Sequence, residues 1–146
     1  MKEFLERLGK VWVPMTDPPE TGTVPLDSGR LSDAELSEWL GKCTAWLAYA
    51  HSQLGIAEAQ KTLVHKRFTR AANAKVIEGG VKQKTYDLQI SEVMLNDPML
   101  QRLEEEVTEQ EARISLWNRM AKAYDSYVRL FSGEVDKRKW TREKGG

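Results

Sequence analysis

Residues 100–135 read LQRLEEEVTEQEARISLWNRMAKAYDSYVRLFSGEV, and this stretch decides the fold. It contains eleven positions that are spaced alternately three and four residues apart, and only one of these positions, Gln110, is polar. A sustained spacing of about 3.5 residues is typical of a helix that lays one apolar seam against another helix. The seam consists of Leu100, Leu103, Val107, Gln110, Ile114, Trp117, Ala121, Tyr124, Val128, Phe131 and Val135.

A second row with the same spacing occupies the first half of the chain and predicts a second long helix. Ser32 with Glu35 forms a capping box at its start, and Gly79-Gly80 supplies a stop after about Val76. Gly55 lies inside this helix and weakens it, so we expect a bend or a break there unless packing outweighs the cost. The row is Leu36, Leu40, Cys43, Leu47, Ala50, Leu54, Ala57, Lys61, Val64, Phe68, Ala71 and Lys75.

The connector between the rows, residues 81–96, is ambiguous in its local structure. Tyr86, Leu88 and Ile90 alternate as in a short strand, although a helical turn is equally compatible with the pattern. Asp97 is a suitable N-cap, Pro98 suits the first helical position, and the helix that follows can run to about residue 138. Two helices joined in this way are expected to form an antiparallel, coiled-coil-like hairpin.

The predicted hairpin register brings the two polar seam positions close together. Lys61 would lie within about one helical turn of Gln110, and each is the lone polar interruption deep within its row. Buried polar residues at such positions fix the register of coiled coils. We therefore expect a polar contact between these two side chains.

The N-terminal residues, 1–30, lack the long seam pattern of the rest of the chain. Residues 1–13 are compatible with a short amphipathic helix, in which Phe4, Leu8 and Trp12 can pack onto the body of the protein or onto a partner. Prolines 14, 18, 19 and 25 then prevent regular structure up to about residue 30, and a disordered leader is the alternative. The sequence thus predicts an all-α protein with an N-terminal short helix and Pro-rich linker, 1–30, and a helical hairpin domain, 31–146.

Both predicted helices carry more apolar surface than one seam covers. Between residues 114 and 131 the second helix is apolar nearly all round, which indicates burial on several sides. Ten exposed large apolar side chains, each worth roughly 1.5–3 kcal/mol on burial, would drive association. We therefore expect a homo-oligomer built through the helices. The expected oligomerisation residues are Ile114, Trp117, Met120, Tyr124, Tyr127, Val128 and Phe131.

Composition and charge place the chain among soluble helical proteins. It has 22 Lys and Arg residues and 22 Asp and Glu residues, so its formal net charge is zero. No apolar run is long enough for a membrane span, and the N-terminus lacks the apolar core of a secretion signal. The single cysteine, Cys43, agrees with a reducing compartment. A cytoplasmic protein without a membrane partner is the expectation.

The residue patterns that support catalysis are missing from the sequence. His51 and His65 lack a second ligand at a metal-binding spacing, and no phosphate loop or nucleophile elbow occurs. Glu104, Glu105 and Glu106 are consecutive, and consecutive helical residues point in different directions, so these carboxylates form a solvated acidic face or a docking surface. We expect neither an enzyme nor a cofactor or metal.

A basic surface is the feature that most suggests a function. Helical spacing places Lys66 and Arg70 opposite the seam and Arg67 on its shoulder. Lys82, Lys84 and Tyr86 follow in the connector. Cations that follow a phosphate backbone, with an aromatic ring for base stacking, are typical of sites for single-stranded nucleic acid. An ordinary solvated helix face is the alternative.

Two short motifs in the first helix resemble a known family. Ser37-Glu38-Trp39-Leu40, and Glu58-Ala59-Gln60-Lys61 leading into Lys66-Arg67, are similar to the first long helix of the phage recombination mediator family typified by UvsY. The resemblance covers about residues 31–140. It implies a small helical protein that forms ring-like oligomers, binds single-stranded DNA and loads a RecA-like recombinase onto strands covered by single-strand-binding protein.

The resemblance also implies which residues contact DNA. The lysine and arginine of the family map onto Lys66 and the neighbourhood of Phe68. Since a phenylalanine stands at the arginine position, Arg67 or Arg70 would take its place. The sequence therefore favours a non-enzymatic recombination mediator. The alternative is a helical oligomeric scaffold or adaptor that acts through protein-protein contacts only.

Overall fold

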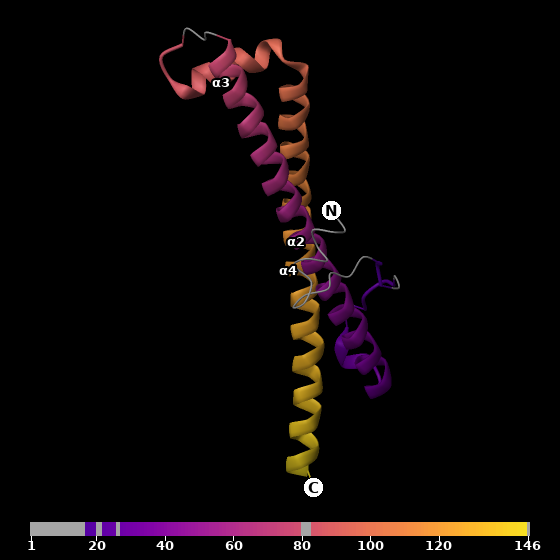
Figure 1. Ribbon diagram of the computed structural model, residues 1–146. Helices are drawn as coiled ribbons and strands as arrows, with labels where there is room; N and C mark the ends of the chain where they lie inside the picture. The colour runs from indigo at the N-terminus through magenta and orange to yellow at the C-terminus, as the bar shows by residue number, and fades with distance from the viewer. Residues whose placement is uncertain (1–16, 20–21, 26, 80–82, 146) are drawn as a thin grey trace, which may run out of the picture. The chain divides into compact units, whose positions relative to one another are not determined.

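The computed structural model describes residues 17–19, 22–25, 27–79 and 83–145, and these residues are helical wherever their structure is regular. A short 3-10 helix, η1 (Ser28–Arg30), is followed by α2 (Asp33–Glu78), α3 (Tyr86–Asn96) and α4 (Pro98–Gly145). Figure 1 labels α2, α3 and α4. The contacts divide the chain into two compact units. We call Met1–Leu54 with Leu116–Gly146 the terminal unit and Gly55–Ser115 the central unit, and each contains a part of α2 packed against a part of α4.

The predicted capping box starts α2. The amide of Glu35 donates to the Ser32 hydroxyl at 3.2 Å, and the Glu35 carboxylate accepts from the Ser32 amide at 2.8 Å. These two bonds hold the pKa of Glu35 below its usual range, and the bond from the Ser32 amide has the larger effect. Leu31, just before the cap, packs against the cluster that contains Leu36. The sequence signal for this helix start is confirmed in full.

The glycines inside the long helices do not end them. α2 continues through Gly55 to Glu78, so the expected break is not found, although the border between the two units falls at this glycine. The amide of Gly79 donates to the Lys75 carbonyl at 2.9 Å at the predicted stop. α4 continues through Gly133 to Gly145, beyond the expected end near residue 138.

The terminal unit has its core between the beginning of α2 and the second half of α4. Leu36, Cys43 and Phe131 are buried together, at 2%, 1% and 0% exposure. Because Asp33 pairs with Arg138 while the later Trp46 stacks on the earlier Tyr124, α2 runs antiparallel to α4 here. Further along, the rings of Trp46 and Tyr124 stack with their centroids 5.5 Å apart. Burial raises the pKa of the Cys43 thiol, as suits the predicted role of this residue as a small apolar side chain.

The described part of the Pro-rich leader packs on this unit. Val24 contacts the Leu36 cluster, and Gly22 lies against the Trp39 ring, where an added Cβ would be 3.0 Å from it. Regular structure before α2 is limited to the single turn of η1 in the described residues. The Pro-rich linker as a whole stays a prediction, because much of it lies outside the described residues. The predicted short helix at 1–13, with Phe4, Leu8 and Trp12, lies outside the described residues.

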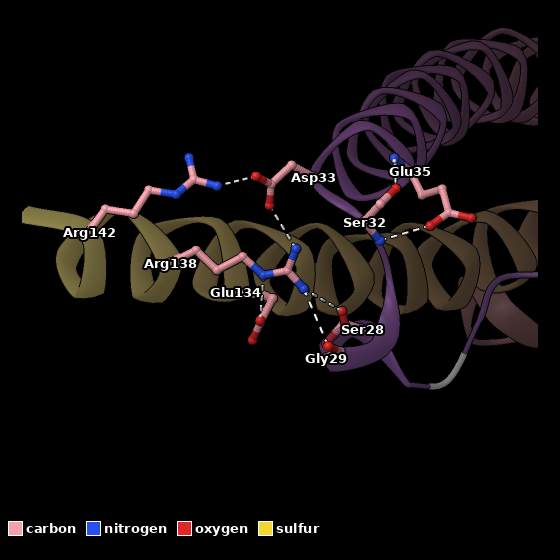
Figure 2. A network of polar contacts seen from close by, with 8 residues as sticks. All are labelled: Ser28, Gly29, Ser32, Asp33, Glu35, Glu134, Arg138 and Arg142. Carbon is pink, nitrogen blue, oxygen red and sulfur yellow. Dashed lines mark hydrogen bonds and ion pairs between the residues drawn. The ribbon is translucent and has the colours of Figure 1, made fainter. Parts of the chain in front are cut away.

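One arginine joins the leader, α2 and α4, as Figure 2 shows. Arg138 donates to Asp33 Oδ1 at 2.8 Å and to Glu134 Oε1 at 2.8 Å, and its third nitrogen reaches the carbonyls of Ser28 and Gly29 at 3.4 Å. Arg142 pairs with the second oxygen of Asp33. The hydrogen bond from Arg138 is the main reason that the pKa of Asp33 lies below its ordinary value. This contact places the leader against the core of the terminal unit.

The central unit packs the end of α2 against α3 and the start of α4. Ala72, Leu100 and Leu103 are buried together, and α3 contributes Ile90, among others, to the same cluster. The connector is therefore helical, which decides between the two alternatives left by its sequence. Its strand-like alternation is misleading, because Tyr86 and Leu88 are exposed and only Ile90 faces the core.

Both α3 and α4 begin with a side-chain cap. The Thr85 hydroxyl accepts from the Leu88 amide at 3.4 Å at the start of α3. Asp97 Oδ1 then accepts from the amides of Met99 and Leu100 at 2.9 and 3.3 Å, with Pro98 at the first helical position as predicted. Both caps satisfy amides that have no partner within the helix.

The expected contact between Lys61 and Gln110 is not formed. Lys61 Nζ pairs with Glu111 Oε1 at 2.9 Å, while Gln110 Oε1 is buried without a hydrogen-bond partner. Glu111 follows Gln110 directly, so Lys61 still lies in the region of α4 that the predicted pairing of the helices indicates. An ion pair with a carboxylate at the edge of the seam is favoured because both charges keep contact with water: Lys61 is 39% and Glu111 53% exposed.

Candidate nucleic-acid interface

The basic face predicted from sequence lies on the part of α2 that belongs to the central unit. Val64, Phe68 and Ala71 pack toward the buried cluster of this unit. At 100° per residue, Lys66 and Arg70 then point to the opposite side, and both are exposed. Arg67 is also exposed and lies at the edge of the apolar seam. The apolar pattern of α2 thus fixes the orientation of these cations, because the same helix must bury its other side.

These three cations have no carboxylate partner among residues 17–19, 22–25, 27–79 and 83–145, whereas two neighbouring lysines of α2 do. Lys61 pairs with Glu111 at 2.9 Å, and Lys75 lies 3.9 Å from Asp97. The positive charge of the face is therefore not compensated within the described part of the central unit. Such a patch attracts a polyanion at short range even though the whole chain is neutral.

An open groove of about 430 Å³ adjoins the basic face. Lys66 belongs to both the face and the groove, and Ile114 of α4 contributes an apolar side chain to the lining. His65 and Lys61 line it as well, so the groove can offer further donors beside an apolar contact. The complete lining is Glu58, Lys61, Thr62, His65, Lys66 and Ile114.

The groove was missed in the sequence analysis, which considered His65 only as a metal ligand. The signal was present, since residues 58, 61, 62, 65 and 66 follow the three-and-four spacing of one helix face. What the sequence lacked was the partner side chain from α4. Ile114 was expected at a subunit interface, and the structure places it beside Lys61 and Lys66 of the same chain.

Tyr86 is held next to the basic face by a hydrogen bond. Its hydroxyl donates to Asn73 Oδ1 at 2.8 Å, and Asn73 lies one turn beyond Arg70 on the same side of α2. The side chain remains 53% exposed, so its ring is accessible to a stacking partner. Lys84 is also exposed, two residues before Tyr86, whereas Lys82 lies outside the described residues.

The residues expected at the subunit interface are mostly used inside the protomer. Phe131 is fully buried, Tyr127 and Val128 pack against its cluster, and Tyr124 and Trp117 contact rings of α2. Met120 is half-buried. Self-association stays a prediction, and the apolar surface that the described α4 offers for it is the row Leu116, Ala123 and Leu130, with Leu116 54% and Leu130 43% exposed. These three residues are seven apart, as in a second heptad seam.

Other kinds of site have little support in the described residues. No group of three or more His, Cys, Asp or Glu side chains in them is arranged to hold a metal ion. None of the helices in the described part of the chain is both long and apolar enough to cross a membrane. Comparison of the chain with known protein families, with curated proteins and with solved structures found no match.

Proposed function

We propose that this protein binds single-stranded DNA through the basic face of α2 and acts as a non-enzymatic recombination mediator. The observation that carries the proposal is the set of three exposed cations, Lys66, Arg67 and Arg70, without carboxylate partners among the described residues. Phosphate contacts supply most of the affinity for a single strand and depend little on sequence. The exposed ring of Tyr86 supplies a platform on which a base can stack.

The groove beside the face suits the same ligand. A strand that follows Lys66, Arg67 and Arg70 with its phosphates can direct a base into the groove, where Ile114 offers an apolar contact and His65 a donor. The proposed role in loading a RecA-like recombinase onto strands covered by single-strand-binding protein rests on the family resemblance of the first long helix. Assembly of several protomers would repeat the weak face and raise the affinity by multivalency.

A fluorescence-anisotropy titration with labelled oligothymidylate at two salt concentrations tests DNA binding. Each phosphate contact contributes about −0.7 to the slope of log K against log salt for single strands, so three contacts give a slope of about −2. The triple variant Lys66→Ala, Arg67→Ala, Arg70→Ala should lose this slope. The matched control removes three exposed cations of α4, Arg102, Arg119 and Lys122, and should retain it.

The role of Tyr86 is separated by two substitutions. Tyr86→Phe keeps the ring and removes only the hydrogen bond to Asn73, whereas Tyr86→Ala removes the ring. A stacking role predicts that the alanine variant loses about 1–3 kcal/mol of binding free energy and the phenylalanine variant much less. Equal losses would indicate that Tyr86 acts only by positioning the start of α3.

A scaffold or adaptor protein is the second candidate function. The exposed carboxylates of Glu104, Glu105 and Glu106 favour it, because they form an acidic surface that a protein partner can recognise. The titration distinguishes the two candidates. Absence of binding at low salt, or binding that the triple alanine change leaves intact, would eliminate the mediator. For a mediator, addition of the protein should also speed strand exchange by a RecA-like recombinase on covered strands, and the triple variant should not.

A further inference from the structure

A second groove, separate from the basic face, lies within the terminal unit between the first turns of α2 and the end of α4. Its volume is about 210 Å³. Asp33, Leu36, Ser37 and Leu40 line it from α2, and Val135, Arg138, Lys139 and Arg142 line it from α4. The groove thus combines aliphatic side chains with three cations and a single lining carboxylate, and the function proposed above makes no use of it.

The cations of this groove differ in what they can still bind. Arg138 is fully engaged, since its nitrogens donate to Asp33, Glu134 and the carbonyls of Ser28 and Gly29. It is a structural arginine. Arg142 pairs with Asp33 through one terminal nitrogen, and its side chain is 69% exposed. A guanidinium carries five N–H donors in a fixed geometry, so most of the donors of Arg142 remain available.

Lys139 is the second available cation. It is exposed and has no carboxylate partner within the described ranges 17–19, 22–25, 27–79 and 83–145. Lys139 and Arg142 are three residues apart and therefore neighbours on one side of α4. The half-buried Leu40 and Val135 lie in the same lining. The groove accordingly presents two cations beside a short aliphatic surface.

We infer that this groove binds an acidic peptide segment of a partner protein, with carboxylates on Lys139 and Arg142 and an apolar side chain on Leu40 and Val135. Charge complementarity supports this assignment: the two cations that remain available can pair with carboxylates, and Arg142 can do so in a bidentate manner. The aliphatic lining gives an apolar side chain next to those carboxylates a place out of water.

A nucleic acid fits this groove less well than a peptide does. Trp140 is the exposed ring of this helix end, at 59% exposure, and its face is covered by Lys144 Nζ at 4.4 Å from the ring centroid. It lies about 100° around the helix from Lys139 and about 160° from Arg142, so it does not line the groove. Single-strand sites need an aromatic platform beside the cations, and the groove lacks one among its lining residues.

The test is an anisotropy titration of the full chain with a short fluorescein-labelled peptide of aspartates and glutamates around one central leucine. A second peptide with serine in place of the leucine measures the apolar contact. The variant Lys139→Glu reverses one charge in the groove. The matched control is Lys137→Glu, which makes the same change two residues earlier on another side of the same helix, at an exposed residue outside the groove.

Lys139→Glu should weaken binding of the leucine peptide by about tenfold, and Lys137→Glu by less than about twofold. The serine peptide should bind about fivefold more weakly than the leucine peptide, as the loss of one partly buried aliphatic contact predicts. Undetectable binding of the leucine peptide at low salt would overturn the inference. Equal effects of the two lysine variants would also overturn it, because they indicate non-specific attraction to a basic helix end.

Two further outcomes would assign the groove to another occupant. If labelled oligothymidylate binds and competes with the peptide in a manner that depends on Lys139 and not on Lys137, the groove is a nucleic-acid contact and the peptide assignment is wrong. If Lys139→Glu lowers the molar mass of the protein in light scattering, the occupant is an acidic surface of a second copy of this chain. Unchanged mass together with selective loss of peptide binding supports the inference.

Discussion

Asp33, at the first position of α2, accepts a hydrogen bond at 2.8 Å from Arg138, which follows it by 105 residues near the end of α4. The same carboxylate pairs with Arg142, and Arg138 also reaches two carbonyls of the leader. One aspartate therefore connects the beginning of one long helix with the end of the other. The contact lies within the terminal unit and closes it at its helix ends.

The Asp33 contact predicts a stability that depends on pH. The arginines hold the pKa of Asp33 below its ordinary value, so the folded state favours the carboxylate more than the unfolded state does. This stabilisation is present above the unfolded pKa, about 3.9, and is lost as the pH falls through the lower folded value. Asp33→Asn should lower the Tm at pH 7, and the difference from the unmodified protein should shrink at pH 3.

The control for this prediction is Asp125→Asn. Asp125 pairs with Arg129 at 2.9 Å within one helix, and Arg129 is 80% exposed, so its loss should change the Tm little at either pH. Thermal unfolding followed by circular dichroism measures both variants. A Tm difference for Asp33→Asn that is the same at pH 3 and pH 7 would contradict the assigned cause.

Phe131→Ala should remove the centre of the terminal core. The side chain is fully buried against Leu36 and Cys43, and deletion of a buried phenylalanine costs about 3–5 kcal/mol. Urea denaturation measures the change in the free energy of unfolding. The adjacent Leu130 is 43% exposed, so Leu130→Ala should cost less than about 1.5 kcal/mol. Similar losses in the two variants would mean that Phe131 is not the core residue of this unit.

Gln110→Leu should stabilise the protein by about 1 kcal/mol. Gln110 Oε1 is buried without a hydrogen-bond partner, and an unsatisfied buried acceptor carries its full desolvation penalty. Gln101→Leu is the comparison variant and should destabilise the protein. Gln101 Nε2 donates to the Met94 carbonyl at 2.7 Å, and leucine cannot make this bond. Denaturant melts of both variants test the pair. A destabilised Gln110→Leu protein would show that the glutamine has a partner in solution or an essential role in assembly.

Ser32→Ala should destabilise α2 by about 1 kcal/mol, since it removes the acceptor that caps the Glu35 amide. Ser37→Ala changes an exposed serine in the second turn of the same helix and should be neutral or slightly stabilising, because alanine has the better helix propensity. Hydrogen exchange at the first amides of α2 gives a local readout. Unchanged protection in the Ser32 variant would refute the capping role.

The sequence was most informative where one local signal decided the outcome. The capping box of Ser32 and Glu35 and the Asp97-Pro98 start are short-range features, and both were predicted correctly. The pairing of the two long helices followed from matching the two seams, and Lys61 meets Glu111, the residue after the expected Gln110. The basic face was predictable for the same reason, since the seam of α2 fixes where Lys66, Arg67 and Arg70 point.

The predictions that were wrong or left open concern contacts between residues that are far apart in the sequence. Lys61 had a polar residue and an acid within reach at adjacent positions, and only the packed helices decide that Glu111 is its partner. The helical connector depends on the contact that Ile90 makes with the Leu100 cluster. Nothing local in the sequence distinguishes the aromatic residues that pack inside one chain from those left for a subunit interface.

The amino-acid sequence by itself determined that the described chain is helical, where its two long helices begin and which side of each is apolar. Spacing and capping are properties of a few consecutive residues, so they need no tertiary information. The tertiary structure alone decided that Ile114 completes a groove with Lys61 and Lys66, and that Asp33 meets Arg138 to form the rim of another. These sites combine side chains from both long helices, and their geometry exists only once the two helices pack.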